Sequence, residues 1–314
     1  MKIKLFVSHR IDTDSFVIKN DIITPVYCGA VYKKDKWNKD IIGDNTGDNI
    51  SELRMNFNEL TVQYWAWKNV EADYYGLCHY RRYFALQNEN DGHINEQNQI
   101  HICNYNWHII QHYKIASIYL INKYCKHSSG IIPAPADVRK IKAFGKIQNT
   151  VLELWEAHDG VFFEKIFLDE LLNEILTIKP EFYDSACDYL NQNMHIGYNC
   201  FILNKKLFLG LCEFQFPILF KFIKDIKYKK TIKNYPRTLG YMGEILFGIY
   251  IYSLIVKGEN LIPKHLVFFE QVTRVSSYVY YKNVCKLYLK NIIIKYFPSI
   301  IQKWVKILYH KLNK

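Results

Sequence analysis

Residues 56–84, NFNELTVQYWAWKNVEADYYGLCHYRRYF, contain the pattern that decides the fold. Leu60, Tyr64 and Trp67 recur at i, i+4 and i+7, which predicts a helix over residues 56–69 that packs against a sheet. A short apolar strand follows and stops at His79. With a strand expected at the N-terminus and a loop before the helix, this order of elements favours a parallel α/β sheet.

The strand runs directly into His79, Tyr80, Arg81 and Arg82. Open parallel sheets bind ligands at the carboxyl ends of their strands. Two guanidinium groups there match phosphate oxygens, and the histidine and tyrosine can donate hydrogen bonds or protons. The segment therefore predicts a diphosphate clamp. The alternative is that both arginines form surface ion pairs and the aromatic residues belong to the core.

Similar patterns outside this segment predict the rest of one domain. The sequence favours strands over residues 3–7 and 130–135, a strand followed by a turn over residues 199–208, helices over residues 151–176, and a long buried helix within residues 237–256. There is no internal repeat and no low-complexity linker. The simplest division is one domain over residues 1–275 and a basic tail over residues 276–314.

Composition excludes several classes of protein. The chain has 314 residues, of which 49% are hydrophobic and 23% charged, so it can bury a large core. Its eight cysteines show no C-x-x-C pair, which speaks against a zinc ribbon and a secreted disulfide scaffold and favours reduced thiols in the cytoplasm. The start is too short for a signal peptide, and the apolar run at 245–256 is too short to span a bilayer.

The positive charge is concentrated in the tail. The net charge is +11, and residues 275–314 hold eight lysines and no acidic residue. Residues 299–313 place Trp304 and aliphatic residues on one helical arc and lysines mainly on the other. This pattern predicts a helix in a membrane interface, and it disfavours a nucleic-acid enzyme, in which basic residues cover a whole face. The alternative is that the helix packs on the domain or on a second subunit.

The loop GDNTGDN, residues 43–49, offers short oxygen ligands. It could hold Mg²⁺ or Mn²⁺ or bind ribose hydroxyls, or it could simply be a turn. The eleven histidines form no zinc motif, so no structural zinc is expected. The sequence contains no G-x-S-x-G, Walker or G-x-G-x-x-G motif either.

Two dense motifs carry a family resemblance. GDNISELRMNFNELTVQYWAWKN (47–69) and ADYYGLCHYRRYF (72–84) resemble the signature of a bacterial glycosyltransferase family found among capsule, exopolysaccharide and O-antigen enzymes. Shorter similar pieces are IIPAP (131–135), residues 155–158, NCFILNKK (199–206) and RTLGYMGE (237–244).

The resemblance implies a GT-A-like fold: a mixed, mainly parallel sheet flanked by helices, here with a helical C-terminal extension. It implies transfer of a sugar, galactose or galactofuranose, from a UDP-sugar to a lipid-linked or oligosaccharide acceptor. The expected partners are these substrates and the inner face of the cytoplasmic membrane, to which the enzyme would bind peripherally, and not nucleic acid. The middle strand ends in His79-Tyr80-Arg81 where better-known GT-A enzymes have D-x-D. No metal cofactor is therefore expected to be required, because the arginines can neutralise the diphosphate, although Mg²⁺ or Mn²⁺ at residues 43–49 remains an alternative.

The resemblance also suggests roles for individual residues. Glu244 is the first choice for the catalytic base, because it follows a glycine-rich segment at a helix start where a ligand can approach; its alternative role is to stabilise the helix dipole. His195 and Asp48 are the other candidates for the catalytic base. The expected donor-binding residues are His9, Arg10, Asp44, Asn45, Asn49, His79, Tyr80, Arg81, Arg82, Asn199, Arg237 and Tyr241. A saccharide-binding or lipid-phosphate-binding protein without catalytic activity is the competing interpretation.

Overall fold

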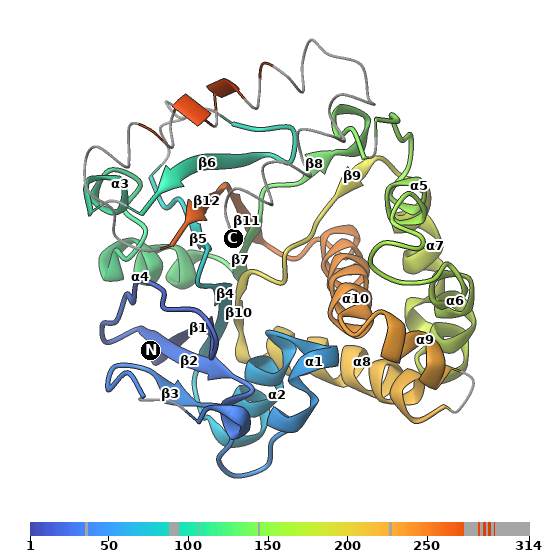
Figure 1. Cartoon of the computed structure of the whole chain (residues 1–314), viewed down its shortest axis with the longest axis horizontal. Helices are drawn as coiled ribbons and strands as arrows, with labels where there is room; N and C mark the ends of the chain where they lie inside the picture. Colours follow the sequence, from blue (N-terminus) through green and yellow to red (C-terminus); the bar gives the residue numbers. More distant parts are fainter. Residues whose placement is uncertain are drawn as a thin grey trace.

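The computed structural model describes residues 1–34, 37–87, 94–105, 107–143, 145–225 and 228–272, with isolated positions between 282 and 292 (Figure 1). The amphipathic helix expected over residues 299–313 lies outside the described residues, as does most of the tail.

In the described part of the chain, ten strands form one sheet. Its main path runs β11-β7-β10-β4-β1-β2-β3, and β5, β12 and β6 extend it from β4. The strands are β1 (Ile3–Arg10), β2 (Ile23–Cys28), β3 (Ile42–Gly43), β4 (Tyr74–His79), β5 (Arg82–Phe84), β6 (Gln99–Asn104), β7 (Gly130–Pro133), β10 (Phe201–Asn204), β11 (Leu261–Lys264) and β12 (Leu266–Gln271). Strands β8 (Ala136–Asp137) and β9 (Met194–His195) form a separate pair.

The sheet is mixed and mainly parallel, as expected. Strand β1 pairs in parallel with β2 and β4, and β2 pairs in parallel with β3. Strand β10 runs antiparallel between β4 and β7. After His79 the chain reverses through Tyr80 and Arg81, so that Arg82 in β5 pairs with His79. The arginine-rich segment is therefore a tight turn at the carboxyl end of a central strand.

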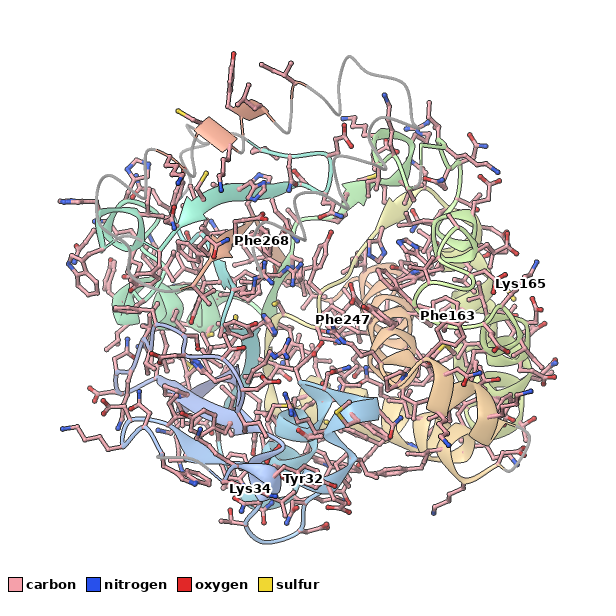
Figure 2. All side chains as sticks on the ribbon, viewed as in Figure 1. Tyr32, Lys34, Phe163, Lys165, Phe247 and Phe268 are labelled. Atoms are coloured by element: carbon pink, nitrogen blue, oxygen red, sulfur yellow. The ribbon has the colours of Figure 1, made fainter. Side chains whose placement is uncertain are left out.

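Helices cover both faces of the sheet. The helices are α1 (Arg54–Phe57), α2 (Leu60–Asn69), α3 (Trp107–His112), α4 (Ile118–His127), α5 (Val151–Glu156), α6 (Ile166–Ile178), α7 (Tyr183–Asn191), α8 (Lys205–Lys224), α9 (Lys229–Asn234) and α10 (Thr238–Val256). Alternating strand residues separate two cores: Phe6 and Leu77 pack with the helices of the larger core, whereas Val7 and Cys78 face the core under α3 and α4. Phe163 and Phe247 are fully buried in the helical half (Figure 2).

The helix expected over residues 56–69 is interrupted. Asn58 has a φ of 49°, which ends α1 and lets α2 begin at Leu60. Helix α2 is buried on two sides, which a single stripe of apolar residues does not predict. Trp65 meets Phe6 of the sheet, while the expected sheet-facing Trp67 stacks instead on Phe216 of α8, with ring centroids 5.6 Å apart. The expectation that Tyr64 and Trp67 pack against the sheet was therefore wrong.

Two other helical predictions have different outcomes. The helical pattern over residues 151–176 divides into α5 and α6, because residues 157–165 form turns around Gly160, which has a φ of 68°. The long buried helix is confirmed as α10. By length and composition α10 could span a membrane, but 72% of its apolar window is buried within the protein, as in the core helix of a globular domain.

Candidate active site

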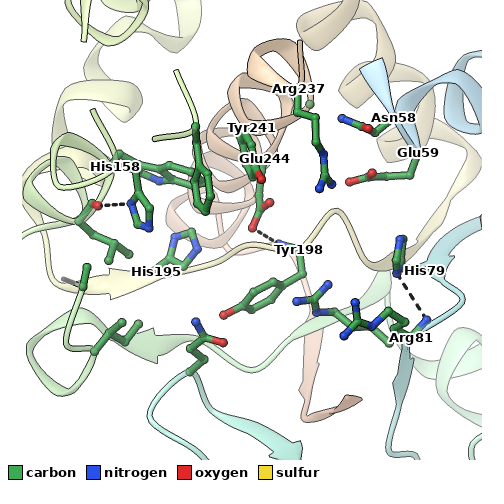
Figure 3. Close-up of a pocket in the computed structure, with 18 of the residues that line it drawn as sticks. Asn58, Glu59, His79, Arg81, His158, His195, Tyr198, Arg237, Tyr241 and Glu244 are labelled. Carbon is green, nitrogen blue, oxygen red and sulfur yellow. Dashed lines mark hydrogen bonds between the residues drawn. The ribbon is translucent and has the colours of Figure 1, made fainter. Parts of the chain in front are cut away.

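A cavity of about 480 Å³ lies where β1 and β4 end, between the sheet and helices α5 and α10 (Figure 3). One part of its wall is cationic and another is aromatic. Among the residues that line it are Arg10, Asn58, Glu59, His79, Tyr80, Arg81, Arg82, Gln97, Lys142, Trp155, His158, Phe162, His195, Tyr198, Arg237, Tyr241 and Glu244. Residues from distant parts of the chain therefore meet at the carboxyl ends of the strands, where the sheet predicts a ligand.

The four arginines of the wall are held in different ways. Arg10 forms a bidentate ion pair with Asp12, and Arg81 donates to the backbone oxygens of Phe269 and Glu270. Arg82 stacks on Tyr198 and Phe268, and its buried Nε has no hydrogen-bond partner. Within the described residues, neither Arg82 nor Arg237 has a carboxylate at ion-pair distance. Their charges are therefore free to meet an anionic ligand.

His79 is a neutral hydrogen-bond donor beside these arginines. Burial, followed by the charges of Arg82, Arg81 and Arg237, holds the pKa of His79 well below its usual value. Its Nδ1 accepts the Arg81 backbone N–H at 3.4 Å. In this arrangement Nε2 carries the hydrogen, which adds a neutral donor to the cationic wall.

Glu244 lies on the cavity wall opposite the sheet (Figure 3). Helix α10 begins at Thr238, so Glu244 is in its second turn and not at the helix start, as the sequence had suggested. Burial raises the pKa of Glu244 to about 7, although the Tyr198 N–H donates to its Oε1 at 2.7 Å and Arg82 and Arg237 favour the charged form. A carboxyl group with this pKa can accept a proton near neutral pH.

His195 lies next to Glu244. A Cβ atom at Gly197 would be 2.4 Å from Nε2 of His195 and 2.7 Å from Oε1 of Glu244, so only glycine leaves room for both side chains. His195 Nδ1 is 3.1 Å from the Tyr189 hydroxyl, and burial lowers the pKa of His195 to about 4. His195 is therefore neutral at physiological pH.

Glu59 is a second carboxylate in the cavity, which the sequence analysis missed. The positive φ of Asn58 positions it at the break between α1 and α2. Its Oε1 accepts from Asn199 Nδ2 at 2.9 Å, and the buried Oδ1 of Asn199 has no hydrogen-bond partner. The available signal was the sequence NFNEL, in which asparagine, tolerant of a positive φ, interrupts a helical pattern.

An aromatic stack forms another part of the wall. The ring of His158 stacks on Phe162 at 4.7 Å, and Phe162 stacks on Tyr241 at 4.4 Å. Arg237 lies over the other end of the stack, 5.5 Å from the Tyr241 ring centroid. Flat aromatic faces of this kind suit the apolar C–H face of a sugar ring. The sequence alone did not single out His158 or Phe162 as site residues, because they lie in irregular turns between α5 and α6.

Of the candidates from sequence, nine line the cavity: Arg10, His79, Tyr80, Arg81, Arg82, His195, Arg237, Tyr241 and Glu244. The structure does not bring the others to its wall. His9 is fully buried and its Nδ1 pairs with Ser15, while Asn199 is buried behind Glu59.

The candidates from residues 43–49 have structural contacts instead. The buried carboxylate of Asp44 accepts from the backbone N–H groups of Gly29 and Ala30 and from the hydroxyls of Ser51 and Thr61. Asp48 accepts from Tyr64 and its N–H donates to Asn69. Neither Asn45 nor Asn49 lines the cavity, and Asn49 donates to the Gly47 carbonyl within the loop. The loop is thus a turn that braces α2, which was the alternative interpretation from the sequence.

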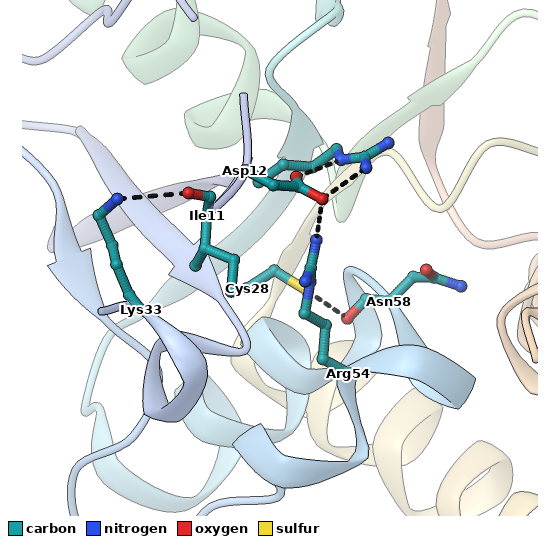
Figure 4. Close-up of polar contacts among 7 residues, drawn as sticks. Ile11, Asp12, Cys28, Lys33, Arg54 and Asn58 are labelled. Carbon is teal, nitrogen blue, oxygen red and sulfur yellow. Dashed lines mark hydrogen bonds and ion pairs between the residues drawn. The ribbon is translucent and has the colours of Figure 1, made fainter. Parts of the chain in front are cut away.

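A smaller cavity of about 160 Å³ adjoins the first and shares Arg10, His79 and Glu59 with it. Asp12 lies on its wall and forms ion pairs with both Arg10 and Arg54 (Figure 4). These two arginines hold the pKa of Asp12 well below its usual value. Asp12 therefore stays charged and orients both arginines at the end of β1.

Comparisons with known proteins give the family of the chain and a solved structure with a similar fold. A family model described as a domain of unknown function, DUF4422, matches residues 4–257. The fold is similar to a solved structure titled the bifunctional glycosyltransferase WbbM in its apo form, with a TM-score of 0.75 and 23% sequence identity. The match covers 86% of this chain but only 45% of the WbbM chain. No curated protein matches the sequence at a significant level.

Proposed function

Because the chain belongs to the DUF4422 family and has the fold of a glycosyltransferase, we propose that it is itself a glycosyltransferase that uses a UDP-sugar. Galactose and galactofuranose are the sugars we expect on the donor. The acceptor is a lipid-linked saccharide or an oligosaccharide in the synthesis of a bacterial surface polysaccharide.

One observation supports the proposal most strongly. A carboxyl group with a pKa of about 7, that of Glu244, opens into the same cavity as Arg82 and Arg237, whose charges have no ion-pair partner among the described residues. Glycosyl transfer needs both features, a base for the acceptor hydroxyl and a positive site for the departing nucleoside diphosphate.

In an inverting transfer, the acceptor's hydroxyl oxygen would bond to the anomeric carbon of the donor sugar. The ionised Glu244 would accept the proton of that hydroxyl group. The bond between that carbon and the diphosphate oxygen would break, and the electron pair would leave with UDP. Arg82 and Arg237 would stabilise the charge that develops on the diphosphate, and Nε2–H of His79 would donate a hydrogen bond to a diphosphate oxygen. The stack of His158, Phe162 and Tyr241 would position a sugar ring beside Glu244.

We propose that the reaction needs no metal ion, because arginines occupy the end of β4. Among the described residues, no three His, Cys, Asp or Glu side chains gather in a way that could hold one. In the loop of residues 43–49, which was the alternative metal site from the sequence, the Asp44 carboxylate already accepts four hydrogen bonds.

We also propose that residues 1–275 are the transferase domain and that residues 276–314 attach it to the inner face of the cytoplasmic membrane. The support is the charge of the tail, which has eight lysines and no acidic residue from position 275 onward. Deletion of residues 283–314 should move the protein to the soluble fraction and preserve transfer to a small soluble acceptor.

The decisive experiment measures UDP release by the purified protein with a panel of UDP-sugars, with and without saccharide acceptors. We expect slow release with one UDP-sugar and faster release with the matching acceptor. Tight binding of a UDP-sugar with no release under any condition would support a binding protein instead. Binding of no nucleotide sugar would contradict the proposed function.

A further inference from the structure

Helices α3 and α4 lie in the longest part of the domain that has no acidic residue. Between Gln97 and Ala136 the sequence contains no Asp or Glu, but it has three lysines and four histidines. The two helices are consecutive and lie on one side of the molecule, away from α5–α10 (Figure 1). The proposed active site uses neither helix.

The outward side of α4, and that of α3 together with the turn after it, each combine an aromatic residue with lysine. On α4, Tyr119, Lys123 and Lys126 follow the i, i+4, i+7 spacing and are exposed, while Ile121 and Cys125 face the core. Tyr119 is 73% exposed.

Helix α3 and the turn after it repeat this arrangement. Trp107, Gln111 and Lys114 have the same spacing and are exposed, whereas Ile110 and Tyr113 are buried. Trp107 is 57% exposed. We call the six residues Trp107, Lys114, Ile118, Tyr119, Lys123 and Lys126 the α3–α4 face.

We propose that the α3–α4 face docks the domain on an anionic lipid surface. Trp and Tyr favour the boundary between headgroups and acyl chains, because one part of each ring system is apolar and another can hydrogen bond. Lysines beside them attract anionic headgroups. This inference rests on the proposed function, because docking on lipid is useful to the enzyme if its acceptor is lipid-linked and must reach the cavity.

The positive charge of residues 275–314 makes it unfavourable for the chain's own tail to cover this face. Residues 275–314 carry eight lysines and no acid, so they would be repelled by three further lysines. Among the described residues, two acidic residues flank this face. Asp21 follows Asn20, which bonds the Ala116 carbonyl, and Glu259 precedes Asn260, which bonds the His127 carbonyl at the end of α4.

The test uses the full chain and sedimentation with vesicles of phosphatidylcholine, alone or mixed with phosphatidylglycerol. The double variant Lys123→Gln/Lys126→Gln should lower partitioning onto the anionic vesicles on the order of tenfold or more, because each lysine near an anionic leaflet contributes about fivefold. Trp107→Ser/Tyr119→Ser should lower binding to both kinds of vesicle. The matched control is Lys206→Gln/Lys233→Gln, which removes the same charge from exposed sites on α8 and α9.

The proposal is overturned if both α3–α4 variants bind vesicles as strongly as the control variant. This includes the outcome in which only deletion of residues 276–314 abolishes vesicle binding. Stronger retention by DNA than by anionic vesicles would also overturn it. UDP release with a soluble acceptor is measured on the same samples. Normal release with weakened vesicle binding supports both proposals, whereas lysine-dependent vesicle binding without any release supports this one and contradicts the proposed function.

Discussion

The carboxyl group of Glu244 is the residue-scale feature with the clearest pH signature. We expect Glu244→Gln to lower kcat by about 10²–10⁴-fold with little change in UDP affinity, because the amide cannot accept the acceptor's proton. In the parent protein the group is ionised above a pKa of about 7, so kcat/KM should fall as the pH drops below 7 and level off above it.

The measurement is UDP release across pH. Asp48→Asn is the informative comparison, because Asp48 lies on an exposed loop that does not line the cavity, and we expect that variant to keep its activity. An unchanged kcat in Glu244→Gln would assign the base to another side chain, with Glu59 the first to test.

Arg81 and Arg82 are adjacent, but they should respond differently to substitution. Arg82→Lys should weaken UDP binding roughly tenfold, about 1.4 kcal/mol, because lysine keeps the charge but loses the forked donors and the stacking on Tyr198. Calorimetric titration of UDP measures this, with Arg139→Lys, an exposed arginine paired with Asp137, as the control. Equal UDP affinity in Arg82→Lys and the control would remove Arg82 from the clamp.

Arg81→Ala should also lower the melting temperature. Arg81 donates to the Phe269 and Glu270 carbonyls and so fastens β12 to the turn after β4. Arg82 is held instead by stacking on Tyr198 and Phe268, so we expect Arg82→Ala to lower the melting temperature less than Arg81→Ala does.

At the scale of elements, the Asp44 carboxylate joins three segments of the chain: residues 29–30, Ser51 and Thr61 of α2. Asp44→Asn should lower the free energy of unfolding by about 3 kcal/mol, because an amide group would face buried donors without a full set of acceptors. Denaturant unfolding measures this. Asp40→Asn removes an exposed ion pair with Lys19 and should cost less than about 1 kcal/mol. Similar losses in the two variants would refute the structural role of Asp44.

The connection between β9 and β10 sets the position of Glu244 and His195. Gly197→Ala should lower kcat at least about tenfold, because the new methyl group would displace one or both side chains from a site that tolerates little misplacement. Gly210→Ala is the control: its Cβ would be 2.5 Å from the Tyr250 hydroxyl, neither residue lines the cavity, and we expect an effect on stability only. If Gly197→Ala turns over normally, the close approach at Gly197 has no catalytic importance.

At the scale of the whole molecule, the proposal that arginines act in place of a metal ion can be tested directly. We expect UDP release to survive EDTA, because the cationic wall supplies the charge that a divalent ion supplies elsewhere. Activity is measured before and after EDTA treatment and again after Mn²⁺ is added. A complete loss that Mn²⁺ reverses would contradict the prediction and would require a metal site that includes a carboxylate of the cavity, such as Glu59.

The sequence by itself determined the class of fold and the cationic end of its central strand. The period of the apolar residues changes from helix to strand between residues 56 and 79, and this local pattern depends little on the rest of the chain. The resemblance to glycosyltransferases also came from the sequence, because the HYRR segment and its neighbouring motifs are dense and contiguous. Sequence periodicity could not show that α2 is buried on two sides, since that depends on α8, more than 130 residues later in the chain.

Only the tertiary structure decided which polar residues share the cavity. Asp44 and Glu244 are both acidic residues near glycines, yet one accepts four hydrogen bonds inside a turn and the other has a pKa of about 7 beside two arginines. The positive φ of Asn58 places Glu59 at the cavity, and the irregular turns between α5 and α6 place His158 and Phe162 there. Neither feature produces a periodic pattern in the sequence. The physical reason is that burial and the charge of neighbours set the chemistry of a carboxyl group, and both depend on residues brought together from distant parts of the chain.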